Sequence, residues 1–160
     1  MAQSPNPTTD SAASHYESHS PDWFTVHVFN KLVALLTRLG FSVLGSRVLE
    51  HRGRRSGDLF HTPVNLLTID GTKYLVAPRG ETQWVRNVRA ADGHLVLILG
   101  RRRQICTATE VPAAERTDVL RTYLRRWKFE VGMFFDGVGP DASEEEFLAI
   151  AERHPVFSLR

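Results

Sequence analysis

The chain of 160 residues is poor in cysteine, in lysine and in long apolar runs. Cys106 is its single cysteine, which excludes an internal disulfide and any zinc site that needs two thiolates. No apolar run approaches the ~18 residues of a membrane span. The first 30 residues hold no Lys or Arg, so the positive region that opens a secretory signal is missing. A length of 160 residues predicts one domain, and the single cysteine fits a reducing cytoplasm.

Several catalytic signatures are missing as well. The seven histidines show no His-Glu-x-x-His spacing, so we expect no metal site. The chain has no Walker A loop and no Gly-x-Ser-x-Gly elbow. A net charge of +2 is too small to indicate nucleic-acid binding, and the arginine run at 101–103 has no aromatic residues interleaved with it. We therefore expect no nucleic-acid partner.

The N-terminal part of the chain divides into a polar tail and an apolar helix. Residues 1–20 are rich in Ser, Thr, Pro and His, which predicts a disordered tail, and residues 21–160 then form a single domain. Three- and four-residue apolar spacings predict a helix over 22–40. Its apolar face suits a peripheral membrane contact or a dimer partner, although the helix lacks the basic polar face that favours membranes. The sequence leaves monomer and homodimer open.

Beyond residue 40 the apolar pattern changes to that of strands. We predict strands at 48–52, 60–69, 73–77, 94–99, 102–110 and 156–159, and Asp70-Gly71 is a strong hairpin signal. Helices are predicted at 82–91, with Thr82 as cap, at 112–127, and after the capping box that begins at Ser143. The pattern indicates an α+β fold with an antiparallel β-barrel and flanking helices, not a βαβ array.

The segment Gly53-Arg54-Arg55-Ser56-Gly57 is the first candidate site. Its glycines allow a sharp turn, its arginines supply forked donors, and its serine adds a hydroxyl donor. A solvated basic turn is the alternative, and an anionic-ligand site is the interpretation we favour.

Three more segments carry ambiguous signals. Pro63, in Thr62-Pro63-Val64-Asn65, implies a strand edge, a bulge that turns backbone groups toward a ligand, or a plain irregularity. Arg79, in Ala77-Pro78-Arg79-Gly80, is a further candidate partner for a phosphate or carboxylate. Trp127, Phe134 and Phe135 either line an apolar pocket for a flat substrate or belong to the core.

Four blocks together resemble the deazaflavin-dependent nitroreductase family, actinobacterial oxidoreductases with a split β-barrel (FMN-binding split-barrel-like) fold: Gly53-Arg54-Arg55-Ser56-Gly57, Thr62-Pro63-Val64-Asn65, Val76-Ala77 and Trp84-Val85-Arg86-Asn87. The resemblance implies the coenzyme F420, used in reduced form. It implies that Arg54, Arg55, Ser56 and Gly57 hold the phosphate and acidic tail. It also implies a coenzyme-binding set beside the deazaflavin ring, which comprises Pro63, Val64, Ala77, Pro78, Arg79, Trp84 and Asn87.

This chain departs from the family pattern at two of these positions. Arg55 stands where better-known members carry Lys, which keeps the charge and changes its geometry. Pro78 stands where they carry Ser, so that hydroxyl is lacking. Protonation would come from solvent or from Tyr123.

The leading hypothesis is an F420-dependent reductase that passes hydride to a small electron-poor acceptor such as a quinone, an enone or a nitro compound. One alternative is a non-catalytic barrel that binds a fatty acid, haem or another apolar ligand. The other alternative is an FMN-dependent reductase.

Overall fold

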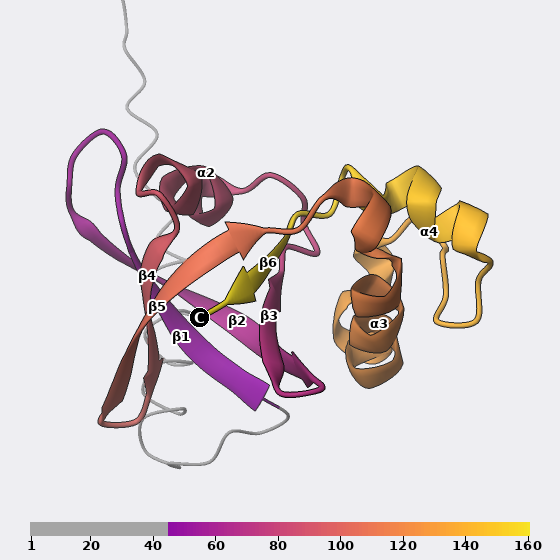
Figure 1. Cartoon of the computed structure of the whole chain (residues 1–160), viewed down its shortest axis with the longest axis horizontal. Helices are drawn as coiled ribbons and strands as arrows, with labels where there is room; N and C mark the ends of the chain where they lie inside the picture. Colours follow the sequence, from indigo (N-terminus) through magenta and orange to yellow (C-terminus); the bar gives the residue numbers. More distant parts are fainter. Residues whose placement is uncertain (1–44) are drawn as a thin grey trace, which may run out of the picture.

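The computed structural model describes residues 45–160, in which six antiparallel strands close into a barrel (Figure 1). The strands are β1 (Ser46–Arg52), β2 (Leu59–Ile69), β3 (Thr72–Val76), β4 (His94–Leu99), β5 (Arg102–Glu110) and β6 (Val156–Leu159). Their order around the barrel is β1-β2-β3-β6-β5-β4, and β4 pairs with β1. The predicted antiparallel barrel is confirmed, whereas the predicted tail and the helix at 22–40 lie outside the described residues.

Three α-helices accompany the barrel within residues 45–160. Helix α2 (Gln83–Ala90) lies across one end of the barrel, and α3 (Thr117–Val131) and α4 (Glu144–Ala151) lie beside it (Figure 1). The prediction that a helix begins at Pro112 is wrong, because Pro112 is extended and the short 3-10 turn η2 (Ala113–Glu115) intervenes. A second 3-10 turn, η3 (Gly132–Phe134), follows α3. No helix in this part of the chain is long and apolar enough to cross a bilayer.

The alternation of side chains along the strands builds two separate cores. On β2, Leu66 belongs to the barrel interior and Leu67 to a second core under α3 and α4. Leu75 and Val76 divide in the same way on β3. Because successive strand residues face opposite sides, one short apolar run serves both cores.

Pro63 lies in an unbroken register between β1 and β2, opposite Val48. The bulge considered from the sequence is therefore wrong. The pairing of β2 with β3 begins only at Leu66, so Pro63 occupies a stretch of β2 that has one partner strand. An edge position tolerates a residue without a backbone N–H.

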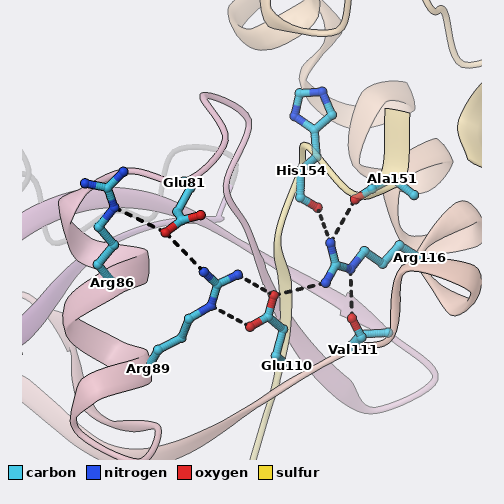
Figure 2. Close-up of polar contacts among 8 residues, drawn as sticks. All are labelled: Glu81, Arg86, Arg89, Glu110, Val111, Arg116, Ala151 and His154. Carbon is cyan, nitrogen blue, oxygen red and sulfur yellow. Dashed lines mark hydrogen bonds and ion pairs between the residues drawn. The ribbon is translucent and has the colours of Figure 1, made fainter. Parts of the chain in front are cut away.

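A buried arginine joins the barrel to the helices (Figure 2). Arg116 is 6% exposed and donates to the carbonyl oxygens of Val111 at 2.7 Å and Ala151 at 2.8 Å. It also donates to Glu110 at 3.0 Å, and Glu110 accepts two further bonds of 2.7 Å from Arg89 of α2. The bonds from Arg89, followed by the nearby charges, hold the pKa of Glu110 below its usual value. This cluster connects α2, β5, α3 and α4.

We expect Arg116→Ala to lower the free energy of unfolding by about 3 kcal/mol, since it removes a buried charge and leaves several carbonyls without their donor. Arg86→Ala removes the exposed pair with Glu81 and should cost less than about 0.5 kcal/mol. Urea denaturation of the two variants measures this difference, and equal losses would contradict the role of Arg116.

Candidate functional site

The basic turn at residues 53–58 connects β1 to β2 at the same end of the barrel as α2 (Figure 1). It is closed by bonds of 2.8 Å from the Gly53 amide to the Asp58 carbonyl and from the Gly57 amide to the Gly53 carbonyl. Gly57 has a φ of +74°, and a Cβ on Gly53 would lie 2.6 Å from the Phe60 ring. The hydroxyl of Ser56 accepts from the Asp58 amide at 3.2 Å. Both glycines and the serine therefore shape the turn itself.

The two arginines of the turn differ in their surroundings. The Arg54 guanidinium donates to Gln83 at 2.7 Å and to the side-chain oxygen of Asn87 at 3.0 Å. The Arg54 backbone amide donates to the same Asn87 oxygen at 3.2 Å. Arg55 is exposed and makes no hydrogen bond or ion pair with residues 45–160. The turn thus offers one cation held against α2 and one that projects into solvent.

Asn87 continues this network into the barrel. Its Nδ2 lies 3.2 Å from Nδ1 of His51, and Nε2 of His51 lies 3.2 Å from the Thr62 hydroxyl. His51 and Asn87 are 4% and 5% exposed, and the His51 ring stacks on Phe60 with a centroid distance of 5.9 Å. Desolvation, followed by the nearby charge of His61, lowers the pKa of His51 to about 4, so its ring is neutral at neutral pH.

The start of α2 is suited to an anion. Thr82 is the N-cap residue, as predicted, but its side chain makes no capping bond, and its buried hydroxyl oxygen has no partner in the described structure. The first turn of α2 holds no acidic residue. A helix N-terminus carries partial positive charge and free N–H groups. With the cation of Arg54 beside it, this donor set fits a phosphate or carboxylate.

A pocket of about 390 Å³ lies beside residues 78–80, in the loop that connects β3 to α2. It is lined by Pro78, Arg79, Gly80, Met133, Phe134, Asp136, Arg153 and His154. The Arg79 guanidinium lies 4.9 Å from the centroid of the Phe134 ring. His154 is 3% exposed, stacks on Phe135 at 4.2 Å, and its Nδ1 has no partner in this part of the chain. Pro78 and Arg79 therefore share one pocket with Phe134.

Other residues singled out from the sequence lie in the cores. Val64, Ala77 and Trp84 belong to the barrel interior, where Trp84 packs against Phe157. Pro63, in contrast, is exposed.

Trp127 and Phe135 lie in the second core instead of lining the pocket. Tyr123 lies there too and is 2% exposed. Desolvation, the largest cause, raises its pKa to about 12, which makes Tyr123 a poor proton donor.

Sequence reasoning missed Gln83, His51 and His154. Gln83 and Asn87 are four residues apart on α2, so their shared face was available as a signal. His51 lies two residues after the interior residue Leu49, so strand alternation places it on the same face. His154 had no local signal beyond its place before Pro155. No group of three or more His, Cys, Asp or Glu side chains able to hold a metal occurs among residues 45–160.

Comparisons with known proteins bear on the fold and the family of this chain. A model of the F420H(2)-dependent quinone reductase family matches residues 25–130. The solved structure of an F420-H2 dependent reductase, FDR-A, gives a TM-score of 0.52 at 18% identity over 72% of this chain and 94% of that one. A structure described as a domain-swapped dimer gives 0.52 at 17% identity, over 88% and 100% of the two chains.

A protein of unknown function from Agrobacterium tumefaciens gives a TM-score of 0.51 at 18% identity, over 78% of this chain and 52% of its own. Comparison with curated proteins gave no match. At these identities the structural likeness shows a shared split-barrel fold, and the family model supplies the assignment.

Burial of neutral His51 predicts a specific acid sensitivity. Its folded pKa of about 4 lies below the ordinary 6.5, so the unfolded chain binds more protons between these values and stability rises with pH there. The stability advantage of the wild type over His51→Phe should be largest above pH 6.5 and shrink as pH falls toward about 4. Urea denaturation of both proteins across this range measures the difference, and a constant difference would contradict the buried neutral ring.

Proposed function

The chain belongs to the F420H(2)-dependent quinone reductase family, and we propose that the basic turn and the start of α2 hold the anionic part of its coenzyme. The protein is an oxidoreductase that uses the deazaflavin F420. When bound in reduced form, the coenzyme supplies hydride to an electron-poor acceptor. The residues of the chain bind and orient the two reactants.

The observation that carries this proposal is the clustering of two arginines and a helix N-terminus at one place. Arg54 is fixed over the first turn of α2 by Gln83 and Asn87, and Arg55 projects beside it. The Thr82 hydroxyl has no partner at the same helix end. A phosphate and an acidic tail offer acceptors to the two arginines and to the N–H groups of the first turn of α2, whereas an apolar ligand offers none. The donor set therefore favours the deazaflavin coenzyme over a fatty-acid or haem carrier.

The deazaflavin ring would lie toward Pro63 and the segment that ends in Pro78 and Arg79. Val64, Ala77 and Trp84 are buried in the barrel interior. We therefore propose that their side chains pack beneath the ring site and that at most their backbone groups contact the ring. Asn87 supports the site in a similar way, because it accepts hydrogen bonds from Arg54 of the turn. FMN carries a phosphate as well, so the preference for F420 over FMN rests on the family assignment.

We assign the acceptor to the pocket formed by Arg79, Phe134, His154 and their neighbours. A flat quinone suits Phe134 and Met133, and the polar groups of Arg79 and His154 can orient its oxygens. Enones and nitro compounds have similar shapes and polarity. Because Tyr123 is buried with a raised pKa and Pro78 has no hydroxyl, solvent is the proton source we favour.

Two broader properties also belong to this proposal. The domain-swapped dimer among the similar structures favours a homodimer, which light scattering of the purified protein tests directly. We place the enzyme in the cytoplasm, where reduced coenzymes are maintained, and cell fractionation tests that placement. The extent of the single domain, 21–160, stays a prediction as well.

Titration with oxidised F420, followed by its fluorescence, tests the coenzyme site. We expect Arg54→Ala to weaken binding roughly 30-fold and Arg55→Ala roughly fivefold, because the first removes a fixed charge-assisted donor and the second an exposed cation. The matched control is Arg101→Ala/Arg102→Ala, which removes two exposed arginines, one from the turn between β4 and β5 and one from the start of β5, at the opposite end of the barrel.

Affinity for F420 should stay at the wild-type value in that control. Unchanged affinity in both turn variants would refute the coenzyme site. Tighter binding of FMN than of F420 would instead support the flavin alternative.

We expect Phe134→Ala to raise KM for a soluble naphthoquinone roughly fivefold while the affinity for F420 is unchanged, because the variant loses a wall of the acceptor pocket. Phe129→Ala is the matched control, since Phe129 is fully exposed on α3. Steady-state kinetics with quinone as the varied substrate measures both. An effect on F420 affinity alone would move Phe134 into the coenzyme site.

A further inference from the structure

Asn87 has its hydrogen-bonding groups directed at protein partners. Its oxygen accepts from the Arg54 amide at 3.2 Å and from the Arg54 guanidinium at 3.0 Å, and its nitrogen lies 3.2 Å from His51 Nδ1. The residue is 5% exposed. A ligand bound over the turn therefore meets Arg54 before it meets Asn87.

The orientation of this amide follows from the chemistry of its neighbours. A backbone N–H and a guanidinium can only donate, so the oxygen of Asn87 must face Arg54 and its NH₂ must face His51. Nδ1 of His51 must then be the accepting nitrogen, and the ring proton must lie on Nε2. Nε2 in turn donates to the Thr62 hydroxyl at 3.2 Å. One tautomer of one buried ring is consistent with all of these contacts.

We propose that His51 is a positioning residue for coenzyme binding: its accepting Nδ1 fixes the amide of Asn87, which in turn holds Arg54 toward the anionic ligand. This inference rests on the proposed function of the basic turn. The opposite tautomer would place an N–H of His51 against the NH₂ of Asn87. Turning the amide to relieve that contact would set its NH₂ against the two Arg54 donors.

A purely structural role for His51 would have a different signature. The ring also packs on Phe60 and bonds to Thr62, and loss of these contacts would change stability alone. Loss of the acceptor for Asn87 would instead release Arg54 and change coenzyme affinity. The two contributions separate because His51→Phe keeps a flat ring against Phe60, whereas His51→Asn restores an amide oxygen near the position of Nδ1.

The experiment is titration of oxidised F420 into the wild type, His51→Phe and His51→Asn, with thermal unfolding as the control for folding. We expect His51→Phe to weaken binding roughly tenfold and His51→Asn roughly two- to threefold. In turnover, KM for reduced F420 should rise in His51→Phe while kcat at saturation stays at the wild-type value. Unchanged affinity in His51→Phe would overturn the inference.

A double variant shows whether His51 acts through Arg54. Arg54→Ala/His51→Phe should bind F420 no more weakly than Arg54→Ala alone, since the residue that His51 positions is already gone. Additive losses would overturn the inference. If Arg54→Ala and Arg55→Ala both leave the affinity unchanged, the proposed coenzyme site fails and this inference with it; if Arg54→Ala alone does so, this inference fails. If Arg54→Ala weakens binding and His51→Phe does not, this inference alone fails.

Imidazole nitrogen NMR of the wild type gives an independent readout should His51→Phe not fold. Correlation of the ring nitrogens with the ring protons of His51 identifies the protonated nitrogen. A proton on Nε2 supports the inference, and a proton on Nδ1 overturns it.

Discussion

The pair of hydrogen bonds that Asn87 accepts from Arg54 is the contact on which the candidate site depends. It joins two segments 33 residues apart in the chain, the turn after β1 and the helix after β3. Without it, the turn would be a cationic loop at the rim of a barrel. With it, one arginine is held over the N-terminus of α2, and positive charge from two sources acts on the same volume. His51, which is buried and contacts the Asn87 amide, fixes the orientation of that amide toward Arg54.

The second part of the site depends on how the helices are fastened to the barrel. Arg116 binds Glu110 at the end of β5 and the carbonyls of Ala151 and His154 at the end of α4 (Figure 2). The backbone of His154 is thereby fixed, and its ring rests on Phe135. The pocket wall built from the end of α3 and the segment before β6 is thus tied to the barrel end that carries α2. The basic turn and the pocket at Arg79 are thus connected through one network of hydrogen bonds and packed elements.

Local patterns were reliable wherever a single interaction decides the structure. Strands β4, β5 and β6 have the predicted bounds, because short strand-like segments bounded by turn residues are local signals. The capping box at Ser143 is present for the same reason. The predicted helix start at Pro112 was wrong, because Pro112 is extended, a 3-10 turn follows it, and α3 begins only at Thr117. The sequence left Trp127 and Phe135 undecided between core and pocket, since an aromatic residue carries no mark that separates the two, and both lie in the second core.

Local patterns were sufficient to predict the antiparallel barrel, the cationic turn and the kind of ligand that such a turn attracts, because alternation, turn residues and charge act over a few neighbouring positions. The folded chain was needed to show which of those residues are exposed at the turn and which support them from the interior. Arg54 is exposed and Asn87 is buried, and the hydrogen bond between them holds the Arg54 guanidinium against α2. Barrel closure brings distant residues together, and no local pattern encodes the tautomer, burial or partner that results.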